Sequence, residues 1–342
     1  MNQLNRTRPM RPRLTLIVPV YNEEDAIEPF LSSVSEKLGG VASDLEILFV
    51  NDGSTDSTIV VLREISKRDD RIRIIDFARN FGKEAALTAG LDFASGDVVV
   101  PIDVDLQDPP ELIPTFLDKW REGYDVVYGV RRSRAGDSRA KRITAGAFYR
   151  AFSKLSKTDI PQNVGDFRLM DKRVVVALRS LRERNRFMKG LFAWTGFRSI
   201  GVPYERPSRK VGVTKWGWWK LWNFALDGFV SFSTVPLRIW SYIGGCVASL
   251  AFLYATIIII RVLLYGIDVP GYASLLTVVL FLGGMQLLSI GIIGEYIARL
   301  FEETKQRPIY IVGDVYQGNS IATRYDRVDR RASVSLPESR GH

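Results

Sequence analysis

Short apolar runs alternate with helical patterns along the first 130 residues. Five runs have the length and composition of buried strands: 14–20, 45–50, 72–77, 97–102 and 125–130. Four intervening segments have helical patterns: 22–38, 56–68, 83–94 and a segment that starts at 109. This alternation predicts an α/β domain whose mostly parallel sheet has helices on both faces. Ligands of such sheets bind at the carboxyl ends of the strands.

Polar residues gather where the predicted strands end. They are Tyr21-Asn22-Glu23, Asn51-Asp52-Gly53-Ser54, Arg79 to Lys83, Asp103 to Asp108, and Arg131-Arg132. The acidic bend, Asp103 to Asp108, is the most informative, because residues two apart on extended backbone share a face. Asp103 and Asp105 therefore suit a hard divalent cation that holds phosphate oxygens. A solvated surface turn would have the same sequence.

The next hundred residues are more mixed. We expect a basic helix at 138–157, a strand at 165–170, a helix from 172 and a loop at 203–215. Four tryptophans then follow among lysines within 216–222. Such a segment predicts an amphipathic helix at a membrane interface, over 216–238, or else a buried core helix.

Two long apolar segments, 239–265 and 272–298, each exceed the roughly 20 residues that a membrane-crossing helix needs. The short turn between them predicts a hairpin with both ends on one side. The turn contains Asp268. Four basic residues flank the outer ends of the two segments: Arg238, Arg299, Lys305 and Arg307. The positive-inside rule then places both ends in the cytoplasm. The alternative is a buried helical hairpin of a soluble core.

Composition narrows the chemistry. The chain has 342 residues and a formal net charge of +9, which suits nucleic acid, anionic lipid or phosphorylated ligands. Its single histidine is His342, so a Ser-His-Asp triad or a His-ligated zinc site lacks its essential part. Neither a Walker sequence nor a Gly-x-Gly-x-x-Gly turn is present, which argues against ATP hydrolysis and dinucleotide redox chemistry.

Five ordered blocks carry a family resemblance. They are Val18-Pro19-Val20-Tyr21-Asn22-Glu23, Val50-Asn51-Asp52-Gly53-Ser54-Thr55-Asp56, Arg79-Asn80-Phe81-Gly82-Lys83-Glu84, Asp103 to Pro110, and Gly165-Asp166-Phe167-Arg168-Leu169-Met170. Together they resemble the family 2 glycosyltransferases that act on polyprenyl phosphates, which include dolichyl-phosphate mannose synthase and the bacterial undecaprenyl-phosphate (bactoprenol) glucosyltransferases. The resemblance covers about 13–312. Val104 and Val213-Thr214-Lys215 are mild departures from the family's pattern.

The resemblance implies a GT-A-like sheet and inverting transfer of a hexose from a nucleotide sugar to undecaprenyl phosphate. UDP-glucose is the favoured donor, with GDP-mannose and a UDP-aminoarabinose derivative as alternatives. It also implies a homotetramer in the inner (cytoplasmic) membrane, with no nucleic-acid partner. We accordingly divide the chain as follows: a disordered basic tail (1–13), a cytoplasmic catalytic domain (14–215), the interface segment (216–238), the two-helix hairpin (239–298), a juxtamembrane segment (299–317) and a disordered tail (318–342).

The resemblance also implies roles for individual residues. Mg²⁺ or Mn²⁺ would be held by Asp103, Asp105 and Gln107, with Asp105 as the direct ligand and Asp103 acting through water or the ribose. The nucleotide sugar would contact Pro19, Tyr21, Glu23, Asp52, Lys83, Asp103 and Asp105. The acceptor phosphate would be bound by Arg131, Arg142, Arg209 and Lys215, since arginine binds phosphate in two places. The resemblance matches Arg131 and Arg209 best, whereas Arg142 is chosen mainly from the spacing of the basic helix. Asp166 would lie beside the reacting sugar, and we expect Asp105, Asp166, Arg131 and Arg209 to be catalytic.

Simpler interpretations remain open for three of these residues. Asp52 could merely form a turn, Asp166 could pair with Arg168, and Lys83 could be a solvated helix lysine. For the whole chain, the alternatives are a processive polysaccharide synthase, a non-catalytic membrane protein that binds acidic lipid, and a nucleic-acid binder.

Overall fold

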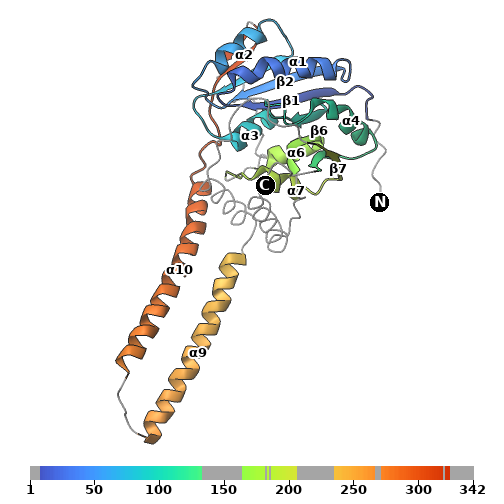
Figure 1. Ribbon diagram of the computed structural model, residues 1–342. Helices are drawn as coiled ribbons and strands as arrows, with labels where there is room; N and C mark the ends of the chain where they lie inside the picture. Colours follow the sequence, from blue (N-terminus) through green and yellow to red (C-terminus); the bar gives the residue numbers. More distant parts are fainter. Residues whose placement is uncertain are drawn as a thin grey trace, which may run out of the picture. The chain divides into compact units, whose positions relative to one another are not determined.

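The computed structural model describes residues 8–132, 164–181, 183–184, 186–205, 235–265, 271–318 and 320–323. The chain divides into two compact units. The sheet unit comprises Met1–Tyr149, Ile160–Gly217 and Pro308–His342, and the hairpin unit comprises Arg150–Asp159 and Trp218–Arg307. Figure 1 shows the labelled helices and strands of both.

The described strands of the sheet unit form one sheet, in the order β7-β5-β6-β4-β1-β2-β3-β8-β9. Their bounds are β1 Arg13–Val20, β2 Asp44–Asn51, β3 Ile72–Phe77, β4 Val98–Pro101, β5 Val126–Arg131, β6 Val164–Asp171, β7 Ser199–Tyr204, β8 Val312–Gln317 and β9 Ser320–Thr323. Neighbours β1–β2, β2–β3, β1–β4 and β5–β7 are parallel, whereas β6 runs antiparallel to both β4 and β5. The strand β8 also runs antiparallel to its neighbours β3 and β9, so seven of the nine described strands point the same way. The sheet is mostly parallel in this sense, which confirms the predicted fold class.

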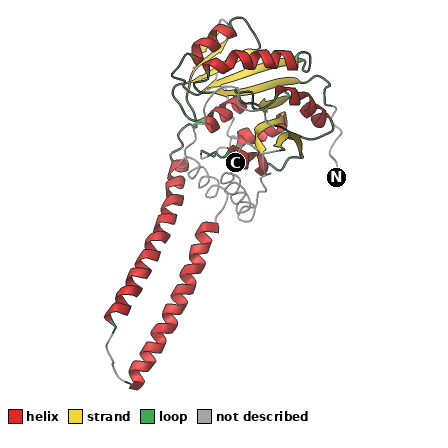
Figure 2. Cartoon of the chain, in the orientation of Figure 1, coloured by secondary structure: helices red, strands yellow, loops and turns green. Residues whose placement is uncertain are grey.

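Helices cover both faces of this sheet (Figure 2). Their bounds are η1 Glu24–Ala26, α1 Ile27–Leu38, α2 Thr58–Ser66, α3 Lys83–Phe93, η2 Pro110–Leu112, α4 Ile113–Arg121, α6 Lys172–Ser180 and α7 Met188–Trp194. Alternate residues of β1, such as Leu16 and Val18, share a core with Phe30 of α1 and Phe116 of α4. On the opposite face, α3 approaches β1 so closely that a Cβ on Gly90 would lie 2.1 Å from Ile17 Cγ2. Only glycine permits that approach.

Strand direction decides which residues meet. Because β1 to β5 point the same way, their carboxyl ends lie along one edge of the sheet, which we call the carboxyl edge. The antiparallel β6 instead brings its amino end, with Gly165 and Asp166, to that edge. The β4–β6 register pairs Val98 with Asp171 and Val99 with Met170. Continued outward, the same register sets Asp166 opposite Asp103.

The strands β7, β8 and β9 are absent from the sequence prediction. Residues 203–204, expected in a loop, end β7, and β8 and β9 lie in the expected juxtamembrane segment and disordered tail. All three strands are short, and β7 and β8 each contain only two buried residues, such as Val312 and Tyr316 of β8. Such patterns are hard to distinguish from loops.

The strand β8 pairs antiparallel with β3, so the chain that follows the second apolar helix returns to the sheet. Tyr310 secures this return. Its ring stacks on Phe77 with centroids 5.2 Å apart, and its hydroxyl donates to Asp92 Oδ2 of α3 at 2.8 Å. The sheet unit is therefore built from chain on both sides of the hairpin.

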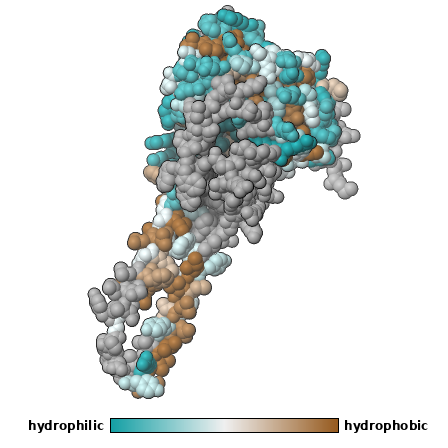
Figure 3. Space-filling model, in the orientation of Figure 1, coloured by the Kyte–Doolittle hydropathy of each residue, from teal (hydrophilic) through white to brown (hydrophobic). Residues whose placement is uncertain are grey.

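The hairpin unit contains two long helices, α9 Val235–Tyr265 and α10 Tyr272–Thr304. Apolar side chains are exposed around α9, among them Leu250, Phe252 and Leu253, and along α10, among them Leu287, Leu288 and Ile290. The apolar colouring of both helices is visible in Figure 3. Within the described residues, Phe281–Thr304 is long and apolar enough to cross a membrane, and a shorter apolar stretch covers Tyr242–Tyr254. Residues 216–234 of the predicted interface segment lie outside the described residues, and its last four residues, 235–238, begin α9.

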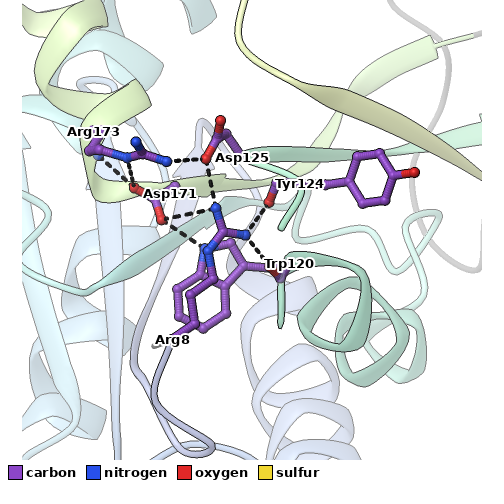
Figure 4. Close-up of polar contacts among 6 residues, drawn as sticks. All are labelled: Arg8, Trp120, Tyr124, Asp125, Asp171 and Arg173. Carbon is purple, nitrogen blue, oxygen red and sulfur yellow. Dashed lines mark hydrogen bonds and ion pairs between the residues drawn. The ribbon is translucent and has the colours of Figure 1, made fainter. Parts of the chain in front are cut away.

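Residues 8–13, which the sequence predicts to belong to a disordered tail, instead pack on the sheet unit. The side chain of Arg8 is only 11% exposed and forms an ion pair with Asp125 Oδ1 at 2.7 Å. Arg8 also donates to the carbonyls of Trp120 and Tyr124. Asp171 accepts from Trp120 Nε1 at 2.8 Å, and Arg173 pairs with both carboxylates. Figure 4 shows the guanidinium of Arg8 at the centre of this cluster.

Replacing Arg8 with alanine is expected to lower the free energy of unfolding by about 2–4 kcal/mol. The buried carboxylates of Asp125 and Asp171 would then have Arg173 as their remaining cationic partner. The midpoint of thermal unfolding of the full chain in detergent measures this loss of stability. Arg11→Ala is the matched control, since Arg11 is an exposed arginine of the same segment. Equal midpoints for the two variants would contradict the prediction.

Candidate active site

The acidic bend follows β4 at the carboxyl edge. Asp105 Oδ1 accepts a hydrogen bond from the backbone N–H of Gln107 at 3.1 Å, which closes a tight turn. Leu106, inside that turn, has a φ of 56°, in the left-handed region that side chains other than glycine rarely adopt. Asp103 and Asp105 are half-buried, and Val104 between them is buried. The bend is thus a held conformation rather than a loose surface turn.

Lys83, the first residue of α3, connects this bend to β6. Its Nζ lies 2.7 Å from Asp103 Oδ1 and 3.1 Å from Asp166 Oδ2. Burial opposes the charge of Lys83, but the two carboxylates outweigh it and raise the lysine's pKa. Burial also opposes the charge of Asp166, yet Lys83, Lys189 and Arg168 together lower its pKa to about 2. The side chain of Lys83 is 43% exposed, but it is not an isolated helix lysine, because it is the cation between two carboxylates.

Arg168 has a different role from the predicted ion pair with Asp166. Its guanidinium donates to the carbonyl of Gly165 at 2.8 Å and lies 3.8 Å over the ring of Phe192. Burial lowers the pKa of Arg168 to about 10, although the charge of Asp166 opposes that shift. The close ion pair of Asp166 is with Lys83, and Arg168 fixes the backbone that presents Asp166.

The loops after β1 and β2 are joined by asparagine side chains. Asn22 accepts from the backbone N–H of Thr55 at 2.8 Å, and its own N–H donates to Ser54 Oγ at 3.0 Å. Asn51, which is almost fully buried, accepts from the Ser54 hydroxyl at 2.6 Å and donates to Asp76 Oδ1 at 2.7 Å. Sequence reasoning placed Asn22 and Asn51 in motifs but assigned them no role.

Asp52 holds the loop that leads into α3. Its carboxylate accepts from the backbone N–H groups of Phe81 at 2.7 Å and of Gly82 at 2.9 Å. Burial raises the pKa of Asp52 despite these bonds. Gly53 allows the loops to approach, because a Cβ there would lie 2.4 Å from the carbonyl carbon of Arg79. Asp52 thus positions Lys83 through the backbone, whereas its contact with a nucleotide base stays a prediction.

Two family models match the chain. Glycosyl transferase family 2 matches residues 15–178, and the GtrB C-terminal hairpin matches residues 235–300. The chain is also 50% identical over 307 residues to the SfII prophage-derived bactoprenol glucosyl transferase of Shigella flexneri, covering 90% of this chain and 99% of that protein. The chain belongs to glycosyltransferase family 2.

Two further proteins are similar to this glycosyltransferase. An uncharacterized glycosyltransferase of Synechocystis sp. is 51% identical over 307 residues, covering 90% of this chain and 96% of that one. Among solved structures, the mannosyltransferase PcManGT from Pyrobaculum calidifontis in complex with GDP-Man and Mn2+ is 25% identical, with a TM-score of 0.40 over 56% of this chain and 55% of that chain. Family membership makes the protein an enzyme and removes the alternative of a non-catalytic lipid binder.

The other predicted site residues of the glycosyltransferase are distributed as follows. Pro19 is the second-last residue of β1, Tyr21 beyond it is 40% exposed, and the N–H of Glu23 donates to Thr58 Oγ1. Arg131 is the last residue of β5 and is half-buried. These four residues follow or end strands at the carboxyl edge. Three predicted acceptor residues lie outside the described residues: Arg142, Arg209 and Lys215.

The donor set of the acidic bend fits a hard cation. The described ranges contain no group of three or more His, Cys, Asp or Glu residues that could hold a metal by themselves. Asp103, Asp105 and the amide of Gln107 would therefore leave positions that a ligand's oxygens must fill. Mg²⁺ is bound in this way in proteins, by one or two carboxylates together with substrate phosphates.

Glu84 of the glycosyltransferase is a half-buried acid that sequence reasoning left without a role. Its Oε2 accepts from the backbone N–H of Met188 at 3.0 Å. Burial and the charge of Asp166 raise the pKa of Glu84 to about 7, although the Met188 bond, Lys83 and Lys189 oppose the shift. Only the three-dimensional neighbourhood distinguishes Glu84 from an ordinary acidic residue in the first turn of a helix.

Glu84 should make stability fall between about pH 4.5 and 7. The folded protein keeps this proton up to about pH 7, whereas the unfolded chain loses it near the ordinary glutamate pKa of 4.5. Folding therefore binds a proton across this window, which costs up to about 3 kcal/mol above pH 7. Glu84→Gln should match the wild type at pH 4.5 and unfold at a higher temperature at pH 8. The exposed Glu122→Gln serves as the control, and parallel pH curves for Glu84→Gln and the wild type would refute the expectation.

Proposed function

We propose that this glycosyltransferase transfers a hexose, with inversion, from a nucleotide sugar to a polyprenyl phosphate at the membrane. Glucose from UDP-glucose and undecaprenyl phosphate are the proposed substrates. The observation that carries the proposal is the junction at the carboxyl edge, where Lys83 holds the acidic bend against Asp166. The proposed metal ligand Asp103 and the half-buried carboxylate of Asp166 thereby contact the same lysine.

The donor end of the reaction follows from the acidic bend. Asp103, Asp105 and Gln107 would hold Mg²⁺ or Mn²⁺, which when bound neutralises the charge of a departing nucleoside diphosphate. Lys83 adds a fixed positive charge beside Asp103. Asp166 would orient a sugar hydroxyl or stabilise the positive charge that develops at the sugar as the bond to the diphosphate breaks.

The acceptor end needs positioning more than proton transfer. A polyprenyl phosphate is already an anionic nucleophile, so its oxygen can attack the sugar without a strong base. Arg131, at the end of β5, would hold this phosphate next to a second polyanion, and the arginine fork suits that task. Arg142, Arg209 and Lys215 would complete the grip. The name of the Shigella flexneri relative, a bactoprenol glucosyl transferase, supports this acceptor.

The hairpin unit would supply the membrane anchor. Helices that expose apolar side chains all round are found within membranes or large cores, and α9 and α10 expose theirs to the surroundings. We propose that both cross the inner membrane, with the sheet unit on the cytoplasmic side as the positive-inside rule requires. The interface segment and a homotetramer belong to the same proposal.

The test is to incubate the purified full chain with undecaprenyl phosphate, Mg²⁺ or Mn²⁺, and a panel of nucleotide sugars. Mass spectrometry of the extracted lipid identifies the product, and NMR of its anomeric proton reports inversion. UDP-glucose should give a lipid one hexose heavier. Transfer from GDP-mannose or the UDP-aminoarabinose derivative alone would overturn the donor while keeping the reaction class. Absence of transfer from every donor would overturn the proposal.

A further inference from the structure

Resting on the proposed function, we propose that Tyr204 is a positioning residue that fixes Arg131 for the acceptor phosphate and links it to the acidic bend. Tyr204 is the last residue of β7, and the parallel β5–β7 register pairs it with Arg131, the last residue of β5. The two side chains thus leave the sheet at the same level. The inference concerns how the acceptor site is held rather than which residues compose it.

The first observation is a polar connection between three elements. The hydroxyl of Tyr204 donates to Asp108 Oδ1 at 3.1 Å, across 96 positions in the chain. Tyr204 and Asp108 are both buried, at 6% and 4% exposed. Arg131 is the register partner of Tyr204, and the interaction of its guanidinium with the same hydroxyl raises the pKa of Arg131. Asp108 closes the acidic bend, so the bend, β7 and the arginine of β5 share one connection.

The direction of these bonds is fixed. Burial and the charge of Asp108 raise the pKa of Tyr204 to about 12, although Arg131 opposes the shift. The hydroxyl therefore keeps its proton at any pH at which the enzyme works. Because it has one proton to donate, and Asp108 accepts it, the oxygen is left to accept from Arg131. A phenylalanine at this position could hold neither partner.

A second, independent observation concerns Gly165. A Cβ at this position would lie 3.0 Å from Arg131 Nη2, a tighter contact than packed side chains normally make. The guanidinium thus lies against the bare backbone that precedes Asp166. Arg131 Nε is buried and has no hydrogen-bond partner among the described residues. The position of the guanidinium therefore depends more strongly on its contacts with Tyr204 and Gly165. The charges of Asp108 and Asp103 both favour the charged form of Arg131 and raise its pKa against burial.

The ring of Tyr204 has a separate, structural role. It packs edge-on against Phe167 with centroids 6.1 Å apart, and a Cβ on Gly129 would lie 2.7 Å from its Cε1. Tyr204→Phe keeps this ring and removes only the hydroxyl. The substitution therefore separates positioning from packing.

Steady-state kinetics of the full chain in detergent test the inference, with undecaprenyl phosphate and the nucleotide sugar varied in turn. Tyr204→Phe should raise KM for undecaprenyl phosphate about tenfold, the loss expected for a hydrogen bond to a charged group. KM for the nucleotide sugar should stay unchanged. The midpoint of unfolding should fall by only a few degrees, because the lost hydrogen bond to the buried Asp108 costs about 1–3 kcal/mol. Gly165→Ala should raise the same KM by displacing the guanidinium, and Arg131→Lys sets the scale.

Tyr124→Phe is the matched control, because Tyr124 precedes β5 at the opposite end of that strand, and should not change either KM. An active Tyr204→Phe enzyme with an unchanged KM for undecaprenyl phosphate would overturn the inference alone. Equal rises in both KM values would overturn it as well, since they would indicate general damage to the site. Absence of transfer by the unchanged enzyme would overturn the proposed function and this inference with it.

Discussion

Replacing Asp105 with alanine is expected to lower kcat/KM for sugar transfer by about 1000-fold, equivalent to about 4 kcal/mol of transition-state stabilisation. Asp105 would be the direct ligand of the cation that neutralises the leaving diphosphate, and its carboxylate also closes the turn with Gln107. Initial rates with saturating Mg²⁺ or Mn²⁺ measure the loss. Chelation of divalent ions should lower the rate of transfer by the wild type about as much as the Asp105→Ala substitution does.

A fold defect must be separated from this loss. Asp105 is only half-buried, so the alanine variant should keep the thermal midpoint of the wild type within a few degrees. Asp118→Ala, which removes an exposed carboxylate of α4, should retain full activity. If Asp105→Ala transferred sugar at more than about a tenth of the wild-type rate, the assignment of the acidic bend to metal binding would be wrong.

Replacing Asp166 with asparagine is expected to lower kcat by about 100-fold, with a smaller change in KM for the nucleotide sugar. The substitution keeps the shape of a side chain that is only 18% exposed and removes its charge. The effect on kcat follows because a fixed charge beside a reacting centre acts mainly in the transition state. Turnover measured at saturating donor and acceptor gives the comparison, and Asp118→Asn is the isosteric control.

The pH profile adds a second criterion for Asp166. Its folded pKa of about 2 lies below the ordinary value of 3.8, so the carboxylate stabilises the fold at pH values above 3.8 and that contribution is lost as the pH falls through about 2. At any working pH the group is ionised. A kinetic pKa between 5 and 8 that disappears in Asp166→Asn would contradict this role.

The sequence predicts the sheet well because its signals are local. The strands β1 to β6 and the helices between β1 and β5 each have an apolar pattern long enough to identify, and Asp103 and Asp105 share a short motif that follows β4. The basic helix expected at 138–157 lies outside the described residues. Their proposed joint role needs no knowledge of distant chain. The agreement therefore reflects how much of this fold is encoded within segments of about ten residues.

What the sequence could not predict depends on strand direction and on distant partners. The ion pairs of Lys83 arise because β6 runs antiparallel and brings Asp166 opposite Asp103. Arg8 lies in a polar segment whose composition indicates a solvated tail. It is held by partners distant in the sequence, the carboxylates of Asp125 and Asp171 and the carbonyls of Trp120 and Tyr124. Tyr204 gains its importance from register with Arg131, which no pattern within 203–215 indicates.

The return of the chain through Tyr310 to β8 makes the two apolar helices an insertion within a domain rather than an appendage at its end. Truncation of the protein after α10 would remove β8, the strand that pairs with β3, and would leave an unpaired strand edge. A water-soluble version would instead have to excise the helices and splice the flanking chain, so that the residues after them can still complete the fold.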